Sequence, residues 1–312
     1  KRQLKATYQA QRRGGRGVNA MATREEDYAE VLFAASSHDN ILFFTTHGRM
    51  YHLKGYQIPE AGRHAKGTAI INLLPIEQDE KVTAMLAVRD YEEDTSLIMA
   101  TKRGTVKKTS IRDFNMTRKG GLIAIGLNED DDLIDVRIVG KNDTVILSTY
   151  KGMAIRFNED DARAMGRTAH GVRGIRLRED DYVIGMEIAK EGAELLIVTE
   201  GGFGKKTDLS EYKIQTRGGV GIKTYKITEQ TGNIVGIKTV GENVDLMIIT
   251  SEGVIIRMDT ADISTIGRST KGVRLVKLGD GVKVASIALT EHEEEKEESE
   301  EPEKTESPEE NA

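Results

Sequence analysis

The chain contains no cysteine and no tryptophan, and only 4 of its 312 residues are proline. Without cysteine, disulfide bonds, thiolate zinc sites and a cysteine nucleophile are excluded, and the composition fits a reducing cytoplasm. The lack of tryptophan excludes WD40 repeats, which carry a Trp-Asp pair. No apolar run approaches the roughly 18 residues of a membrane helix, and no signal peptide is present. We therefore expect a cytoplasmic chain without a membrane segment.

The formal net charge of −6 combines two segments of opposite sign. Residues 291–312 hold twelve glutamates and two lysines, which leaves residues 1–290 with a net positive charge. The acidic segment has no aromatic residue and no apolar periodicity, which is typical of disorder. We therefore predict a folded domain over residues 1–290 and a disordered acidic tail over residues 291–312. Such a tail could serve solubility alone, or could compete with nucleic acid for the basic body.

A Thr-x-x-Gly element recurs at intervals of about 50 residues. An apolar run precedes each copy and a short alternating segment follows it, a pattern typical of β-hairpins. Five copies are present: Thr45–Gly48, Thr101–Gly104, Thr149–Gly152, Thr199–Gly202 and Thr250–Gly253.

A basic, glycine-containing loop follows each hairpin. The last glycines of these loops are Gly67, Gly121, Gly171, Gly219 and Gly272, and an earlier copy ends at Gly15. Six loops but only five hairpins indicate that the first repeat is cut, so we expect its first strands upstream of Lys1. Six units of about four strands each predict an all-β fold, a six-bladed propeller-like ring with a truncated first blade.

No catalytic site is predicted. The acidic triplets near Asp131, Asp160 and Asp180 fall at turns of separate repeats, where aspartate is a common turn residue. The histidines have no metal-ligand spacing, and no nucleophile elbow, phosphate-binding loop or dinucleotide fingerprint occurs. We therefore expect no catalytic residue, no metal and no cofactor in this domain.

The segment Gln11-Arg12-Arg13-Gly14-Gly15-Arg16-Gly17 is the most distinctive candidate site. Guanidinium groups match phosphate oxygens, and glycines let backbone N–H groups approach an anion closely. Alone, such a run could be a flexible linker, but here it occupies the loop position of a repeat. Further candidate DNA contacts recur in the loops and hairpin turns, namely Arg49, Arg63, Lys66, Lys102, Arg103, Lys107, Arg118, Lys119, Lys151, Arg167, Lys205, Lys206, Arg217, Arg268 and Lys271.

In a ring, these cations would form a continuous basic rim. Such a rim suits the backbone of duplex DNA bound without base readout. The rim has no aromatic stacking platform for single strands and the sequence has no evident recognition helix. Bending a site of 20–30 base pairs by 40–90° costs on the order of 1–6 kcal/mol, so several repeats must share the binding.

The segment Gln11–Gly17 resembles the GyrA box of the C-terminal domain of the bacterial DNA gyrase A protein (GyrA). The repeats resemble the same family over residues 1–290, for example at Gly104–Lys108 and Met165–Arg176. We refer to Gln11–Gly17 below as the box.

The resemblance implies a β-pinwheel whose blades exchange strands and a rim that wraps DNA with positive handedness. The wrapped DNA would be presented for negative supercoiling, driven by ATP on the gyrase B protein. The domain would not be an enzyme by itself, and the ATP and magnesium would be used by the rest of the enzyme. Its partners would be duplex DNA, the N-terminal part of the gyrase A protein and the gyrase B protein, with the isolated domain monomeric and associated with the nucleoid. Since the catalytic tyrosine of the family lies in the N-terminal domain, Tyr8 receives no role.

Two alternatives remain from the sequence. One is the equivalent domain of topoisomerase IV, in which the box is usually degraded. The other is a β-propeller scaffold for protein partners, which predicts apolar or mixed residues on the rim rather than arginine and lysine.

Overall fold

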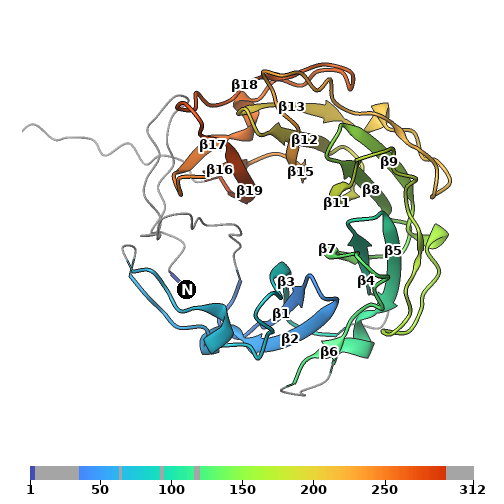
Figure 1. Cartoon of the computed structure of the whole chain (residues 1–312), viewed down its shortest axis with the longest axis vertical. Coiled ribbons are helices and arrows are strands. Elements are labelled where there is room, and N and C mark those ends of the chain that lie inside the picture. The colour runs from blue at the N-terminus through green and yellow to red at the C-terminus, as the bar shows by residue number, and fades with distance from the viewer. Residues whose placement is uncertain (4–34, 63–64, 92–94, 116–119, 293–312) are drawn as a thin grey trace, which may run out of the picture.

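Five β-sheets stand side by side around a central axis in the computed structural model of the chain (Figure 1). The structure describes residues 1–3, 35–62, 65–91, 95–115 and 120–292. In each sheet the inner strand faces the axis, and the two strands of the Thr-x-x-Gly hairpin follow outward (Figure 1). Four sheets carry a further, short strand on the circumference, which we call the outer strand. The fifth sheet has three strands within the described residues.

The strands of one kind have similar lengths in every repeat. The inner strands are β3 (Val82–Val88), β7 (Leu133–Val139), β11 (Val183–Ala189), β15 (Ile234–Val240) and β19 (Val284–Glu291). The first hairpin strands are β1 (Asn40–Thr45), β4 (Ser96–Thr101), β8 (Thr144–Thr149), β12 (Glu194–Thr199) and β16 (Val244–Thr250). The second hairpin strands are β2 (Arg49–Lys54), β5 (Thr105–Ser110), β9 (Met153–Asn158), β13 (Phe203–Asp208) and β17 (Ile255–Asp259). The outer strands are β6 (Leu122–Ile123), β10 (Val172–Arg173), β14 (Ile222–Lys223) and β18 (Val273–Arg274).

Short 3₁₀ helices connect these strands. A 3₁₀ turn follows the hairpin in each described repeat, and a further one lies between the first basic loop and β3. They are η2 (Gly55–Gln57), η3 (Ile70–Asn72), η4 (Ile111–Phe114), η5 (Glu159–Asp161), η6 (Leu209–Glu211) and η7 (Thr260–Asp262).

Neighbouring repeats exchange their outer strands. Strand β6 follows the β4–β5 hairpin in the sequence, yet it pairs with β2 of the preceding repeat, with Ile123 opposite Arg49. In the same way β10 pairs with β5, with Val172 opposite Val106. The strand exchange expected from the resemblance is therefore present in all four complete sheets.

The continuous apolar runs are buried on both faces of each sheet. In β4, Leu97 and Met99 pack with Leu42 of the preceding sheet, while Ile98 packs with Val145 of the following one. All of these side chains have an exposed fraction of 0 %. Alternate residues of one strand thus belong to two different cores, which explains why the runs are apolar throughout rather than alternating.

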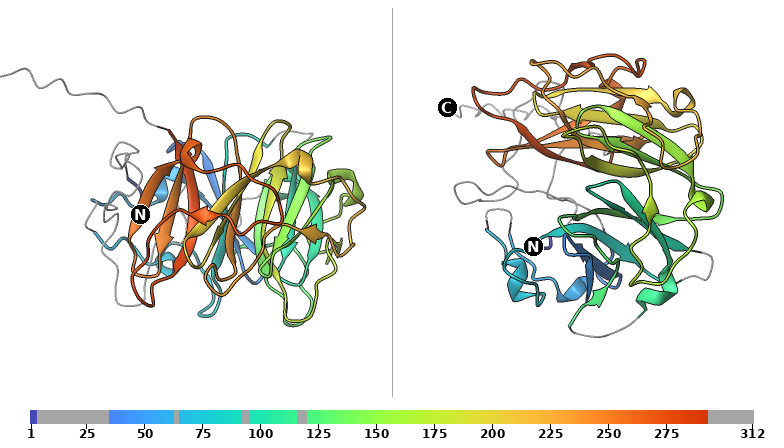
Figure 2. Two further views of the ribbon diagram at one scale, coloured as in Figure 1. Left: turned by 90° about the horizontal axis from the view of Figure 1, so that it is seen from above. Right: turned by 45° about the vertical axis from the view of Figure 1, so that its right-hand side comes forward.

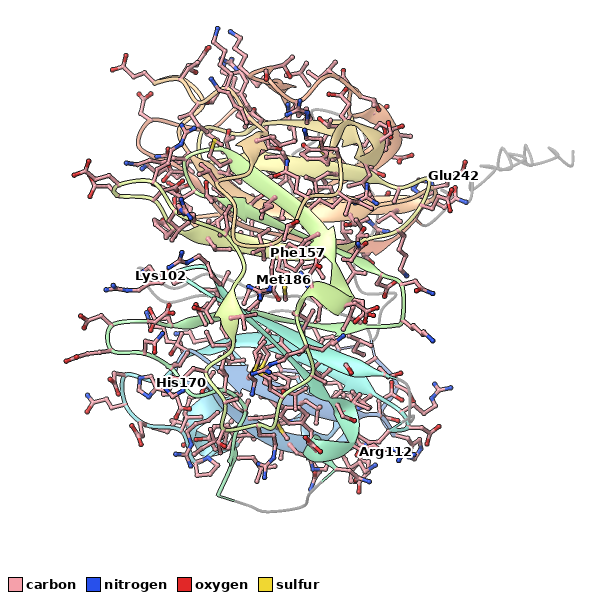
Figure 3. The ribbon with its side chains drawn as sticks, turned by 90° about the vertical axis from the view of Figure 1, so that its right-hand side faces the viewer. Lys102, Arg112, Phe157, His170, Met186 and Glu242 are labelled. Atoms are coloured by element: carbon pink, nitrogen blue, oxygen red, sulfur yellow. The ribbon has the colours of Figure 1, made fainter. Side chains whose placement is uncertain are left out.

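Backbone hydrogen bonds also join adjacent sheets. The first inner-strand residues donate to carbonyl groups in the hairpin turn of the preceding sheet, over 2.9 Å from Val183 to Lys102 and 3.0 Å from Leu133 to Thr46. The hairpin turns therefore lie on one face of the ring and the turns between inner and first hairpin strands on the other. Figure 3 shows this division, since Lys102 and Glu242 project from opposite faces. The strands run between these two faces (Figure 2).

The acidic residues predicted to be turn residues do stabilise turns. Asp131 is buried, and its Oδ1 accepts hydrogen bonds of 2.9 Å from the backbone N–H groups of Arg103 and Asp132. Asp181 accepts in the same way from Lys151, over 3.0 Å. These carboxylates fix the hairpin turns, and Asp160 lies separately in η5.

Residues 1–3 make a contact that second hairpin strands make elsewhere in the ring. Arg2 forms a parallel bridge with Glu60, and its backbone N–H donates to the Pro59 carbonyl over 2.9 Å. The same bridge joins Lys108 to Ala164 and Arg156 to Ile214 in complete repeats. Arg2 therefore corresponds to a residue within a second hairpin strand.

Candidate nucleic-acid interface

Three consecutive outer strands each present two exposed cations on the circumference of the ring. One cation is the second residue of the outer strand, and the other stands three residues later. The pairs are Arg173 and Arg176 at β10, Lys223 and Lys226 at β14, and Arg274 and Lys277 at β18. We call these six residues the outer-strand cations.

The outer-strand cations face solvent without a carboxylate partner. Within the described part of the chain, none of the six forms an ion pair, while the guanidinium of Arg274 lies 5.3 Å from the ring centre of Phe203. A side chain in this state keeps its full charge available for an anion. The sequence analysis missed these residues as contacts, although their constant spacing after the loop glycine was a usable signal.

The outer strand β6 departs from this pattern. Its second residue is Ile123, with an exposed fraction of 47 %, and Gly126 stands three residues later. The positive charge of the outer strands therefore covers β10, β14 and β18 and does not extend to β6.

The loop arginines link each outer strand to the one before it. Nη1 of Arg217 donates to the carbonyl of Arg173 over 3.0 Å, and Nη1 of Arg268 donates to the carbonyl of Lys223 over 2.9 Å. Arg167 makes the corresponding bond to Ile123 over 3.5 Å. These arginines connect the outer strands of neighbouring sheets, in addition to placing positive charge near the rim.

The loop register predicted at one glycine was wrong. Gly121, Gly171 and Gly272 have φ between 72° and 98° and directly precede an outer strand, and the residue in that place in the remaining loop is Gly221 (φ 76°), not Gly219. A Cβ atom on Gly221 would lie 2.3 Å from the Ala154 carbonyl oxygen, so only glycine fits there. The Gly-Gly pair at positions 218 and 219 had suggested the earlier alignment.

The corrected register shows that five of the six loops share an Arg-x-x-x-Gly pattern. It occurs in Arg63–Gly67, Arg167–Gly171, Arg217–Gly221 and Arg268–Gly272, and in the box as Arg13–Gly17. The fourth residue of the pattern is exposed in each of these loops where the structure describes it, as in Lys66 and Lys271.

The hairpin-turn cations lie beside acidic turns rather than on an open basic surface. Lys102 Nζ is 3.9 Å from Asp132, and Arg103 is 3.9 Å from Asp130. Lys151 Nζ donates to the carbonyl of Glu179 over 3.3 Å. Arg49, in the first hairpin, donates to the carbonyl of Gly120 over 3.0 Å. This face of the ring is therefore of mixed charge.

Lys107, Lys205 and Lys206 are not the exposed rim cations that the sequence suggested. Lys107 and Lys205 have an exposed fraction of 0 % because β5 and β13 are covered by the loop that follows in the next repeat. Lys206 forms an ion pair of 2.8 Å with Glu194, and its side chain is 12 % exposed. The ammonium groups of the first two lysines cannot reach a phosphate on the rim.

The box, Arg63, Arg118 and Lys119 lie outside the described residues. Their predicted contacts with DNA therefore remain predictions.

Two groups of histidine and carboxylate side chains have the composition of a metal site. His47 Nδ1 lies 3.6 Å from Glu77 and Nε2 lies 3.5 Å from Asp79, and both carboxylates are exposed. In the second group, Asp245 already accepts hydrogen bonds of 2.7 Å from both Arg257 and His292. The first group is a loose contact with two exposed carboxylates and the second is hydrogen-bonded within itself, so neither supports a metal centre.

Comparison with known proteins supports the interpretation of the repeats. The family model described as "DNA gyrase C-terminal domain, beta-propeller" matches six segments, residues 1–35, 39–89, 95–140, 143–190, 193–240 and 245–291. The chain is 49 % identical over 293 residues to the DNA gyrase A protein of Staphylococcus epidermidis and 48 % identical to that of Staphylococcus aureus. Each alignment covers 93 % of the chain but 33 % of the relative, so the chain spans about a third of these proteins' length.

Solved structures agree with this assignment. A structure titled as the DNA gyrase A C-terminal domain matches with a TM-score of 0.79 and 27 % identity, covering 92 % of the chain and 94 % of that structure. The C-terminal domain of DNA topoisomerase IV matches with a TM-score of 0.73 and 25 % identity, covering 82 % and 80 %. Among the described residues, no helix has the length and hydropathy needed to cross a membrane. With six matched repeats over nearly its whole length, the chain belongs to the family of DNA gyrase C-terminal domains, the non-catalytic β-propeller part of a type IIA topoisomerase.

Proposed function

We propose that this domain binds duplex DNA along its circumference and bends it without reading its sequence. The observation that carries the proposal is the set of six outer-strand cations, repeated at one register on three consecutive sheets. Arginine and lysine neutralise phosphates whatever the base sequence, and their repetition around a ring fits a curved backbone path. The elements of the described residues are strands and single-turn 3₁₀ helices, so this part of the chain has no helix suited to the major groove.

The box would extend this path. In the corrected loop register Arg13 corresponds to Arg167, Arg217 and Arg268, which bond to the preceding outer strand, whereas Arg16 corresponds to the exposed fourth position of the loop. We therefore expect Arg16 to contact phosphate directly, and Arg13 to contribute mainly to loop position.

Within a whole gyrase, the bent DNA would be presented to the rest of the enzyme for ATP-dependent negative supercoiling. The partners would be the N-terminal part of the gyrase A protein and the gyrase B protein, which would use the ATP and magnesium. The isolated domain would be a monomer of the bacterial cytoplasm that associates with the nucleoid. The family membership supports this role, and the present chain would contribute DNA binding and bending to it.

A topology assay tests the proposal. The domain is bound to relaxed circular DNA, a topoisomerase is added, and the supercoils remaining after removal of protein are counted and their sign determined. We expect trapped supercoils, positive in sign if the wrap has the handedness implied by the family. A variant with all six outer-strand cations changed to glutamine is the control and should trap few. DNA that stays relaxed with the native domain, under conditions where it is bound, would contradict bending around the rim.

A further inference from the structure

We propose that Lys107 and Lys205 are positioning residues that hold two of the basic loops in place on the rim. Their ammonium groups lie inside the domain, beneath the loops that end at Gly171 and Gly272. The consequence for DNA binding rests on the proposed function, whereas the contacts themselves are a feature of the fold.

Lys107 is saturated by backbone carbonyl groups. Its Nζ donates to the carbonyls of Ala124 and Arg167, each over 2.5 Å, and to that of Gly166 over 3.2 Å. An ammonium group has three N–H donors, so its full capacity is used. Two of the three acceptors are consecutive residues of the loop that leads into β10.

Lys205 repeats this arrangement two sheets further along the ring. Its Nζ donates to the carbonyls of Gly267 and Arg268 over 2.7 and 2.5 Å, and to the hydroxyl of Thr270 over 3.2 Å. The same ammonium lies 5.2 Å from the ring centre of Tyr225. All three polar acceptors belong to the loop that leads into β18.

The two lysines therefore bind equivalent atoms. Arg167 and Arg268 are the loop arginines whose side chains reach back to the preceding outer strand. Each lysine fixes the main chain of such an arginine, and the loop continues directly into an outer strand with two exposed cations. Removing the ammonium would leave these carbonyl groups, of which that of Ala124 is buried, without their donor.

The charge of these lysines is costly to bury, which favours a specific role over a packing role. Burial lowers the pKa of Lys107 to about 8, with a further lowering by Arg167 and an opposing effect of Asp113. Burial likewise lowers the pKa of Lys205 to about 8, opposed by Glu211 and assisted by Arg268. Both groups are thus mainly protonated at neutral pH and can donate to all three acceptors.

The repeats themselves supply a control. The position of Lys107 and Lys205 is taken by Ile155 in the sheet between them, and Ile155 is fully buried. There the loop arginine Arg217 is anchored differently, since its Nε donates to the carbonyl of Asp161 over 2.7 Å. The fold thus accepts an apolar residue at this position, and the ammonium is specific to two loops.

The test compares the double variant Lys107→Met/Lys205→Met with the control Ile155→Met. Thermal unfolding and circular dichroism establish that each variant is folded. We expect the double variant to bind duplex DNA roughly tenfold more weakly, as for the loss of one or two well-placed phosphate contacts. The control should remain within about twofold of the native chain in the same titration. A folded double variant that binds and bends DNA as the native chain does would overturn the proposal.

A chemical rescue covers the case in which the methionine variant does not fold. The chain has no cysteine, so Lys205→Cys introduces a unique thiol. Alkylation with 2-bromoethylamine in denaturant, followed by refolding, restores an ammonium at nearly the original position; the native chain is taken through the same cycle. We expect the unmodified cysteine variant to be weak and the aminoethylated form to recover affinity, and no gain on modification would contradict the role of the ammonium.

The glutamine variant of the six outer-strand cations is titrated in parallel. If that variant keeps native affinity, the proposed function itself fails. If it loses affinity while the methionine variant keeps it, only the positioning role of Lys107 and Lys205 fails.

Discussion

Changing the outer-strand cations to glutamine should reduce the salt dependence of DNA binding in proportion to the number changed. Each phosphate contact contributes about −0.9 to the slope of log K against log salt concentration for duplex DNA. Removing the two cations of one outer strand should therefore reduce the slope by at most about 1.8, and removing all six by at most about 5. The six together correspond to roughly 10³-fold in affinity between 50 and 200 mM salt. The six variants are Arg173→Gln, Arg176→Gln, Lys223→Gln, Lys226→Gln, Arg274→Gln and Lys277→Gln.

The measurement is a fluorescence titration of a labelled duplex at four or more salt concentrations, repeated with an unrelated sequence of equal length. The control variant, Lys141→Gln/Lys190→Gln, removes two exposed lysines at the turns after β7 and β11, which lie away from the outer strands. The three pairwise variants should lose similar slope on both duplexes, and the control should keep the native slope. An unchanged slope in the sixfold variant would refute the outer strands as the phosphate-binding surface, as would an equal loss in the control.

Other consequences can be tested with single changes. Ile123→Arg extends the outer-strand charge to β6 and should tighten DNA binding and lengthen the protected region in a footprinting experiment. Arg257→Met leaves the buried carboxylate of Asp245 with His292 as its remaining 2.7 Å partner, and loss of the charged hydrogen bond should lower the free energy of unfolding by about 1.5–3 kcal/mol in urea denaturation. The hydrogen bond from His292 to Asp245 raises the pKa of His292 above its ordinary value of 6.5. The stabilisation of the fold by this hydrogen bond is therefore complete below pH 6.5 and is lost as the pH rises through the raised pKa. His292→Ala should remove this pH dependence from the unfolding curve. Truncation after His292 removes residues 293–312 of the acidic tail and should tighten DNA binding at low salt, and an unchanged affinity would mean that these residues do not compete for the rim.

The repeat pattern was enough to predict the ring because every repeat presents the same apolar faces to its two neighbours. The apolar run before each Thr-x-x-Gly turn indicated a strand buried on both faces, and Leu97 to Ala100 are buried between two neighbouring sheets. Even Arg2 follows the repeat, since its bridge to Glu60 is equivalent to those of Lys108 and Arg156.

The candidate site was harder to predict because its charges are decided by tertiary neighbours. Lys107 follows a turn glycine and resembles an exposed cation, but a loop about 60 residues later covers it. Arg103 also resembles an unpaired cation in the sequence. Its acidic neighbour Asp130 lies in the turn that precedes the inner strand β7. The outer-strand cations escaped notice for another reason. Their strands are two residues long, too short for an alternating pattern to distinguish them from a loop.

The repeats keep the loop glycine that the fold requires, but they differ in the residue exposed on the outer strand. Every repeat needs a loop glycine at the approach to the outer strand, as the close contact at Gly221 shows, but none needs a particular residue at the exposed second position of that strand. That position is isoleucine in β6, and arginine or lysine in β10, β14 and β18. In a ring of six repeats we expect the first repeat, which holds the box, to neighbour the sixth, which holds β18. Charge would then follow repeat order from the box through β18 and β14 to β10, and we expect the DNA path to weaken at β6, where Ile123 stands instead of a cation.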